Sequence, residues 1–506
     1  MRPTLKEEDL LLVSKTDYGI NTLTPTSHVH FDPSLVKRGS IVIFSCKDMD
    51  VYDGDTNYFY VIPGKKQFVK RLIGKPGDTL YFYGGKIYGI SANGQDLTEL
   101  RDTPWFQSLE HIPYIRFDGK VQTPNQPVLG TFSSAIFYQM NEPIAKLTTY
   151  SRGIVEGEML QPVKDYYDLW GFKNYAMARL LTHEQAKALH PSALKGLAVQ
   201  PLYLELTHHP SLRGAKLERD EYGRFRPTLV TSVSLLPVSD EKIDAIMQHI
   251  TTCRFIVKDG IATRYGSSFE PKAFLPRMPE VPNGTYEIQD GKASRIFFLG
   301  VSKTLSNDHP LLKRDPKQVQ LLYNLGIEMD EHFAPTTSKQ IRLAPSRYAY
   351  FAHGDLYLMG SPIFFKKDPS LAQFIQKEYQ KQATASPLPY APFDDAGAPI
   401  TADGKIDEAF IRLYGLKVPE KTYLVLGDNH AMSSDSRQFG FVPQDNLRGG
   451  ASFLFWPPGP RWGRLPQPSI PHATLPNVIV WSFFLSTALG TTLYLRRKYN
   501  KPLKFD

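Results

Sequence analysis

Short runs of apolar or alternating residues dominate both ends of the chain, a pattern typical of β-strands separated by turns. Near the N-terminus, turn signals such as Pro63-Gly64 and Pro76-Gly77-Asp78 separate these runs. The predicted strands are Leu10–Val13, Ser40–Phe44, Tyr58–Ile62, Phe68–Ile73 and Thr79–Tyr83, with two more in the stretches TYLVLGD at 422–428 and ASFLFW at 451–456. The pattern therefore predicts a mainly β fold.

The middle of the chain has a mixed character. Strand patterns such as 347–360 alternate there with segments of helical spacing, which are 181–197, 242–250, 316–329 and 370–382. Residues 386–400 are expected to link this region to the second β-rich stretch. We therefore predict a β-scaffold split by a large α+β insert, with a first core part at 1–90, the insert at 91–400, a second core part at 401–456, a proline-rich stiff connector at 457–477, a transmembrane helix at 478–495 and a basic tail at 496–506.

One apolar run stands out near the C-terminus. Val478–Leu495 carries no charge over 18 residues, which as a helix spans about 27 Å, close to the thickness of a bilayer core. Arg496, Arg497 and Lys498 follow at once, and the positive-inside rule places such a tail in the cytoplasm. A buried core helix is the alternative. We therefore predict that Val478–Leu495 spans a lipid membrane and that the tail after it is cytoplasmic. The sequence before Leu10 contains no apolar segment that would carry the chain across the membrane.

The amino-acid composition excludes several classes of function. The 506 residues are 42% hydrophobic and carry a net charge of +8 with no dense basic stripe, which argues against a nucleic-acid partner. Cys46 and Cys253 allow one disulfide at most and no cysteine-based zinc site. His208-His209 and the His28/His30 pair are more typical of packed or surface histidines than of ligands. We predict no metal and no cofactor.

Lys70 is the first candidate for chemistry, because a lysine inside an apolar strand is costly to bury without a partner. Strand alternation sends Lys70 and Arg71 to opposite faces, so at most one of them needs to be buried. One interpretation is an edge-strand lysine that guards against aggregation. The other is a desolvated lysine whose lowered pKa lets the neutral amine act as a general base.

The second candidate is the polar loop from Gly427 to Pro443. A serine there is able to orient a lysine by hydrogen bonding, and Asp435 and Arg437 are placed to form an ion pair that fixes the loop. Asp428, His430 and Ser433 also permit a Ser-His-Asp triad, although triad members normally come from separate elements. A polar turn that satisfies its own hydrogen bonds is the structural alternative.

Taken together, these segments resemble the bacterial type I signal peptidases, serine peptidases of family S26 that use a Ser-Lys dyad on a β-scaffold. Four stretches match in the family's order, over roughly 110–130 residues in two blocks. They are Met1–Leu5, Arg38–Phe44 with Ser40 in place of the usual Asp, Lys70–Asp78, and Gly427–Pro443 with His430 in place of the usual Arg.

The resemblance implies a role for each matching residue. Lys70 is expected to be the general base, and Ser433 to orient it by a hydrogen bond. Asp435 with Arg437, together with Asp428 and Asn429, is expected to hold the loop in place. Shallow pockets for small side chains at the cleavage site are expected from Met1, Pro3, Leu5, Leu11, Ile43, Phe68 and Val69. The implied substrates are the signal peptides of exported preproteins, cleaved after small residues at the outer, periplasmic side of the bacterial inner membrane.

This sequence departs from the family's pattern at the nucleophile. The family's serine would stand directly before Met1, so we expect a longer protein that begins upstream and supplies both this serine and an N-terminal span. The alternatives are a catalytically inactive relative that binds preproteins or partners through the insert, and a Ser-Lys autoprotease of the SOS-repressor type. The C-terminal span argues against the latter.

Overall fold

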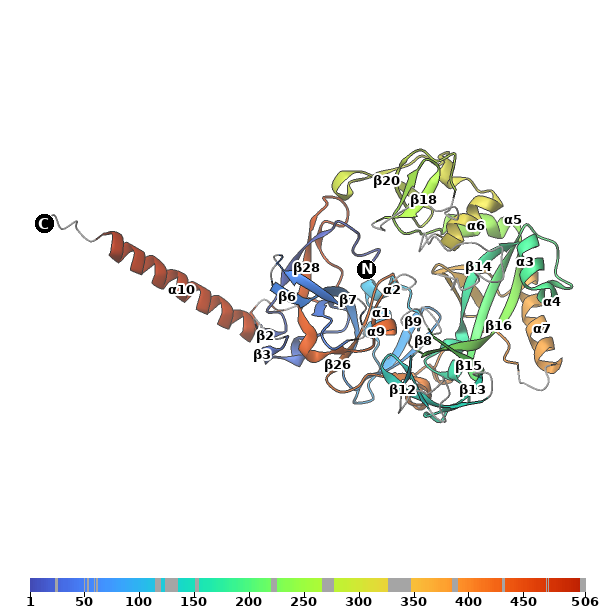
Figure 1. Cartoon of the computed structure of the whole chain (residues 1–506), viewed down its shortest axis with the longest axis horizontal. Helices are drawn as coiled ribbons and strands as arrows, with labels where there is room; N and C mark the ends of the chain where they lie inside the picture. Colours follow the sequence, from blue (N-terminus) through green and yellow to red (C-terminus); the bar gives the residue numbers. More distant parts are fainter. Residues whose placement is uncertain are drawn as a thin grey trace.

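The architecture is that of a computed structural model. It describes residues 1–22, 26–49, 51, 54–58, 60, 62–113, 120–122, 135–150, 154–219, 225–265, 277–325, 347–384, 390–429, 433–469, 471 and 473–500. The fold is mostly β, as the alternating runs predict. Figure 1 shows a body of several sheets from which one long helix projects, and the N-terminus lies in the middle of that body.

The first sheet combines strands from both ends of the chain. Its order is β1-β28-β4-β7-β26-β27, with β29 paired to β28. The bounds are β1 Leu10–Ser14, β4 Ile41–Ser45, β7 Gln67–Gly74, β26 Thr422–Leu426, β27 Val442–Pro443, β28 Leu447–Trp456 and β29 Gly463–Arg464. We call it the core sheet. Because β7 pairs with β4 on one side and β26 on the other, the strand that carries Lys70 is an inner strand.

Three small units flank the core sheet. The hairpins β2 (Gly19–Asn21) with β3 (His28–Phe31) and β5 (Asp55–Tyr58) with β6 (Ile62–Lys65) lie outside it. A three-stranded sheet joins β8 (Thr79–Tyr83) to β9 (Lys86–Ile90) and to β25 at Leu416–Lys417. The short helices nearby are α1 Glu99–Asp102, α2 Pro104–Gln107, α8 Glu408–Tyr414 and α9 Ser436–Phe439.

The middle of the chain forms the largest sheet, ordered β10-β11-β12-β13-β15-β14-β22-β23-β24 with β16 beside β15. Its strands are β10 Lys120–Gln122, β11 Ala135–Gln139, β12 Glu142–Thr149, β13 Ile154–Met159, β14 Tyr175–Thr182, β15 Leu202–Arg219, β16 Phe225–Val238, β22 Arg347–Ala352, β23 Asp355–Leu358 and β24 Ser361–Phe364. Helices that contact it are α3 His183–Leu189, α4 Pro191–Leu194, α5 Asp240–Gln248, α6 Pro316–Leu325 and α7 Pro369–Thr384. The four segments with helical spacing therefore form helices, and 326–329 lies outside the described residues.

A separate sheet follows α5, which we call the small sheet. It consists of β17 Phe255–Lys258, β18 Ile261–Arg264, β19 Gly284–Gln289, β20 Lys292–Ile296 and β21 Ser302–Thr304. Its buried side chains, such as Phe255, Val257 and Ile288, belong to the same apolar cluster as Leu204 and Leu206 of the largest sheet. The two sheets therefore share one core.

Several local predictions need correction. The prediction of one strand from Tyr58 to Ile62 is wrong, since β5 ends at Tyr58, β6 begins at Ile62 and these two residues pair with each other across a hairpin. The connector after Trp456 is more than a spacer, because Phe453 and Leu454 of β28 pair with β29. Cys46 and Cys253 are both buried and are not joined to each other, so the permitted disulfide is absent. The predicted domain boundaries stay predictions.

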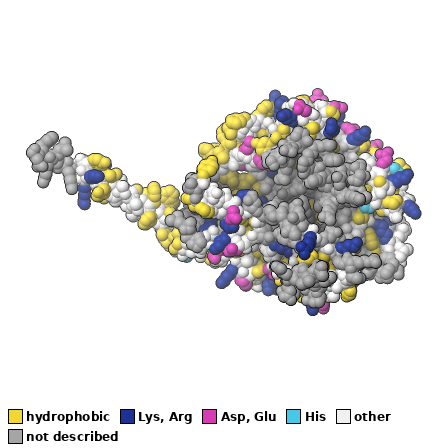
Figure 2. Space-filling view, in the orientation of Figure 1, with side chains coloured by type: hydrophobic (Ala, Val, Ile, Leu, Met, Phe, Trp, Pro, Cys, Tyr) yellow, Lys and Arg dark blue, Asp and Glu magenta, His cyan; other side chains and the backbone are white. Residues whose placement is uncertain are grey.

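The apolar C-terminal run is helix α10, Leu475–Tyr499. By length and composition it is the one candidate membrane span in the described part of the chain, and none of its most apolar 18-residue window is buried. Its end contacts the body through a hydrogen bond between Thr16 and Asn477. Figure 2 shows hydrophobic side chains along this helix and on the adjoining part of the body. A buried core helix is therefore excluded by its exposure.

Candidate active site

Lys70 lies partly buried in the core sheet, directly opposite Val42 of β4. Because β7 is an inner strand, the interpretation of Lys70 as an edge-strand guard is wrong. Burial lowers the pKa of its ammonium group; the negative charges of Asp435 and Asp428 oppose this effect, and the positive charge of Arg437 adds to it. Such an environment favours the neutral amine, which is the form that accepts a proton.

The amino group of Met1 lies within electrostatic reach of Lys70, and the Met1 side chain packs against the apolar cluster that includes Val69, the neighbour of Lys70. Burial and then the charge of Lys70 lower the pKa of this amino group to about 6, and Asp428, Glu7 and Asp435 act in the opposite direction. The backbone turns directly after it, with Leu5 N–H donating to the Met1 carbonyl over 2.9 Å. A residue joined to the Met1 nitrogen is therefore one peptide unit from a point close to Lys70.

The loop after β26 is fixed by a buried ion pair. Arg437 Nε and Nη2 donate to the two oxygens of Asp435 over 2.8 and 2.7 Å, and both side chains are buried. Asp435 also accepts from Gly427 N–H over 2.9 Å. Burial alone would raise the pKa of Asp435, but Arg437 and these hydrogen bonds keep it lowered. The carboxylate thus stays charged next to Lys70 and holds both ends of the loop.

Ser433 lies inside this loop, and its backbone N–H donates to the Asn429 carbonyl over 3.0 Å. Its Oγ is buried and has no hydrogen-bond partner among the described residues. The predicted Ser433–Lys70 hydrogen bond is therefore not formed in this conformation. Ser433 packs so closely on Gly427 that a Cβ added there would lie 2.0 Å from Ser433 Oγ. The triad alternative depends on His430, which lies outside the described residues.

Arg71, the neighbour of Lys70, is a member of the site that the sequence reasoning missed. Its Nε and Nη2 donate to the two oxygens of Asp428 over 2.8 and 2.7 Å, and its Nη1 reaches the carbonyls of Gly39 and Pro466. The Thr4 hydroxyl also donates to Asp428. The alternation of Lys70 and Arg71 across the strand was the available signal, since it placed the two side chains on opposite faces and left Arg71 as a candidate for burial.

Five of the seven predicted substrate-binding residues share one apolar cluster. Leu5 and Ile43 are buried in it, and Met1, Leu11 and Val69 pack against it partly exposed. Phe68 lies on the other face of β7, where its ring is 6.0 Å from Phe44 and 6.2 Å from Phe439. The alternation of the strand separates Phe68 from Val69, so the structure does not bring all seven together.

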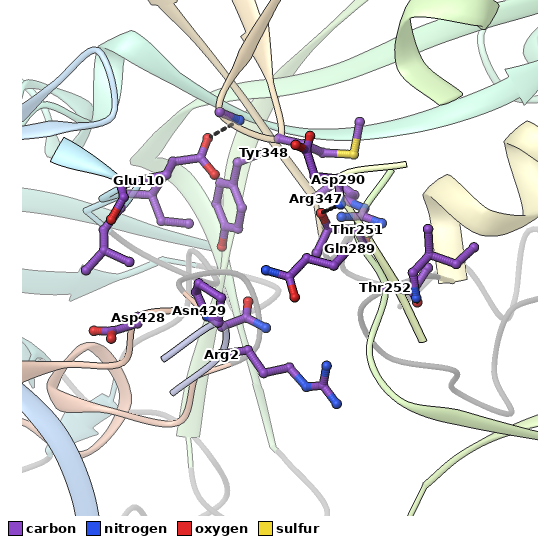
Figure 3. Close-up of a pocket in the computed structure, with 17 residues that line it drawn as sticks. Arg2, Glu110, Thr251, Thr252, Gln289, Asp290, Arg347, Tyr348, Asp428 and Asn429 are labelled. Carbon is purple, nitrogen blue, oxygen red and sulfur yellow. Dashed lines mark hydrogen bonds between the residues drawn. The ribbon is translucent and has the colours of Figure 1, made fainter. Parts of the chain in front are cut away.

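Pro3 lies apart from that cluster and lines a cleft of about 300 Å³. On one side of the cleft are Arg2, Asp428 and Asn429, and on the other are residues of the small and largest sheets, including Gln289 and Arg347 (Figure 3). Arg347 is buried and donates to the backbone carbonyls of Tyr323 and Thr251. The cleft therefore connects the loop after β26 with the middle of the chain.

No group of three or more His, Cys, Asp or Glu side chains in the described ranges is arranged to hold a metal ion. The chemistry that the site offers is that of a desolvated amine between two buried ion pairs, beside an apolar surface. This arrangement fits acyl transfer with an amine base.

Comparison with known proteins finds similarity to one family of peptidases. Residues 1–125 and 353–456 match the family described as signal peptidase, peptidase S26. A 40-residue stretch is 52% identical to signal peptidase IB of Staphylococcus aureus, covering 8% of this chain and 21% of that protein. A 73-residue stretch is 47% identical to the probable signal peptidase I-2 of Synechocystis sp., covering 13% of this chain and 33% of that protein. These matches span only about a fifth to a third of the relatives, and they support the signal peptidase I family.

Proposed function

We propose that this protein is a membrane-bound serine endopeptidase that removes signal peptides from exported preproteins by a Ser-Lys dyad. The observation that carries the proposal is a desolvated Lys70 whose charge acts on the Met1 nitrogen. A serine joined to that nitrogen would present its hydroxyl to the one amine that the site keeps poised as a base.

The proposed reaction proceeds in two steps. In the first, neutral Lys70 accepts the proton of the serine hydroxyl as the serine oxygen attacks the scissile carbonyl carbon. The C–N bond then breaks, and Lys70 returns the proton to the leaving amine, which leaves an acyl-serine ester. In the second, Lys70 takes a proton from water, the resulting hydroxide attacks the ester, and the serine recovers its proton.

When Lys70 has accepted the proton, its positive charge must be stabilised by nearby negative charge, because the site is buried. Asp435 and Asp428 provide negative charge nearby, and their pairing with Arg437 and Arg71 holds both carboxylates in place. We propose that Ser433 turns its unpartnered Oγ toward Lys70 when substrate displaces solvent and so orients the amine. Catalytic hydrogen bonds are often long in unliganded sites and shorten in the complex.

Substrate selection is proposed to rest on the apolar cluster of Met1, Leu5, Leu11, Ile43 and Val69. Its side chains are apolar, which suits the small side chains that stand three residues and one residue before the scissile bond in the A-x-A-like end of a signal peptide. We propose that α10 anchors the enzyme in the inner membrane with residues 496–506 in the cytoplasm and the active site on the outer face.

The proposal is tested with the full-length protein in liposomes and a preprotein that has alanine three residues and one residue before the cleavage point. We expect the mature chain to begin directly after the second alanine, as read by mass spectrometry of the products. Phenylalanine in place of that alanine should block cleavage. Uncut wild-type preprotein, or equal cutting of both substrates, would favour the catalytically inactive binding protein instead.

N-terminal peptide mapping of the protein from its native membrane tests whether the proposed nucleophile is present. We expect a serine directly before Met1, and its replacement by alanine should abolish cleavage while leaving the protein folded. Any other residue at that position would remove the proposed nucleophile.

A further inference from the structure

Glu287 of β19 lies far from Lys70 in the sequence, yet it contacts the segment that begins beside Lys70. Its carboxylate is 3.0 Å from Arg2 Nη2 and 3.3 Å from Arg254 Nη2, and it also pairs with Lys6. Only 5% of the Glu287 side chain is exposed. Burial alone would raise the pKa of Glu287, but the three basic groups lower it to about 2, so the carboxylate stays charged.

The small sheet adds further contacts to the same segment, Met1–Asp9, which we call the N-terminal segment. Arg254 Nη1 donates to the Glu7 carbonyl over 3.2 Å and lies 3.7 Å from the Glu8 carboxylate. The Tyr265 hydroxyl donates to Glu8 over 2.5 Å. Backbone and side chains of the N-terminal segment are therefore both bound by the small sheet.

The opposite side of the N-terminal segment is bound by the core. The Thr4 hydroxyl donates to Asp428, and the Thr4 carbonyl accepts from Arg461 over 3.2 Å. Arg461 also donates to both oxygens of Asp9 over 2.6 and 2.8 Å. The segment is thus held between the core sheet and the small sheet, and Glu287 is the buried charge on the side of the small sheet.

We propose that Glu287 is a positioning residue of the peptidase site: by binding Arg2 and Lys6, it holds the N-terminal segment against Lys70 in the geometry that the reaction requires. This inference rests on the proposed function. It assigns to the small sheet, which lies outside the residues that match the peptidase family, a direct part in shaping the active site.

A change in water access is the physical consequence that distinguishes positioning from general stability. The charge of Lys70 acts on the nitrogen of Met1, where the N-terminal segment begins, and desolvation is the main cause of the lowered pKa of Lys70. If the segment loosens, water reaches the ammonium group and its pKa rises toward the ordinary value. Cleavage should then require a higher pH, and the misplaced nucleophile should also lower kcat.

The test compares Glu287→Gln with Glu280→Gln in the full-length protein in liposomes. Glu280 precedes the same strand and forms an exposed pair with Lys313, so its variant controls for loss of one carboxylate. For Glu287→Gln we expect kcat/KM to fall about tenfold or more, since a displacement of about 1 Å can cost about a hundredfold. The acidic limb of the pH profile should move to higher pH, and Glu287→Asp should restore part of both.

Hydrogen–deuterium exchange of residues 1–9 gives a readout that does not depend on activity. We expect faster exchange there in Glu287→Gln and no change in Glu280→Gln. If Glu287→Gln does not fold, Lys6→Met removes one of the contacts and should show the same shifts in smaller measure.

Unchanged pH profiles in folded variants would overturn the proposal, whether or not exchange becomes faster. A failure of the proposed function is distinguishable from this result. In that case wild type would not cleave preprotein, or Lys70→Ala would retain activity, and the exchange experiment would still report on the contact itself.

Discussion

Arg71 and Asp428 form a two-pronged ion pair in which each side chain is only 1% exposed, and this pair joins β7 to the loop that carries Ser433. Two adjacent residues of one strand therefore have different roles. Arg71 fixes the architecture on one face, while Lys70 on the other face remains free of ion pairs within the described residues and stays available as a base.

Removing one member of this pair should destabilise the protein strongly. For Asp428→Asn we expect a loss of about 3–5 kcal/mol in the free energy of unfolding, because Arg71 is left buried without its counter-charge. Denaturant unfolding in detergent measures it. The exposed pair Arg412–Glu408 is the matched control, and Glu408→Gln should cost less than about 1 kcal/mol. Similar small losses for both variants would contradict the structural role of Asp428.

Gly427 should be intolerant of even one added methyl group. Its Cβ in Gly427→Ala would lie 2.5 Å from the Ser433 Cβ and 2.0 Å from its Oγ, so Ser433 must move. We expect kcat/KM for preprotein to fall by about a hundredfold at a nearly unchanged melting temperature, since small displacements of catalytic groups are costly. Adding Ser433→Gly should relieve the clash without restoring activity. Full activity of Gly427→Ala would show that Ser433 has no part in orienting Lys70.

The orientation of α10 is tested by labelling. Lys498→Cys, placed just after the apolar run, should react with a membrane-impermeant maleimide only after the inner membrane is opened, because basic tails stay in the cytoplasm. The natural thiols Cys46 and Cys253 are buried and provide the background. Labelling in intact spheroplasts would reverse the proposed orientation.

The lowered pKa of Lys70 predicts how stability depends on pH. The unfolded chain keeps the lysine proton up to about pH 10.5, whereas the folded protein releases it at lower pH. Between these two values the unfolded state binds more protons, so folding stability should rise with pH. Below the folded pKa both states are protonated and burial of the charge destabilises the fold. Lys70→Met should remove this rise, and thermal unfolding at a series of pH values measures it. A parallel pH dependence in wild type and variant would contradict a desolvated Lys70.

Local sequence patterns predicted those parts of the site that are formed by continuous stretches of the chain. The strand with Lys70, the loop with Asp435 and Arg437, and the apolar C-terminal helix all follow from spacing and residue type. Alternation indicated that Lys70 and Arg71 lie on opposite faces of the strand, but it left open which of them is buried, because the neighbouring strands β4 and β26 decide this.

Contacts between segments that lie far apart in the chain could not be predicted from the sequence. Glu287 has no local feature that distinguishes it from an exposed strand carboxylate, and its partners Arg2 and Lys6 lie about 280 residues earlier. Phe68 and Val69 were both expected to line the substrate pockets, and they lie on opposite faces of β7, since adjacent strand residues point to opposite sides. The run from Tyr58 to Ile62 was predicted as one strand because its side chains are apolar, whereas Tyr58 and Ile62 pair with each other across a hairpin.

The central claim is that Lys70 is the general base. Lys70→Ala in the full-length protein tests it most directly, with Lys65→Ala as control, because Lys65 lies in an exposed hairpin pair with Asp55. We expect Lys70→Ala to lower kcat/KM for preprotein by a factor of about 10²–10⁴ or more without unfolding, as measured by product mass spectrometry and circular dichroism. Lys65→Ala should cleave as wild type does. Cleavage by folded Lys70→Ala at the wild-type rate would contradict the account.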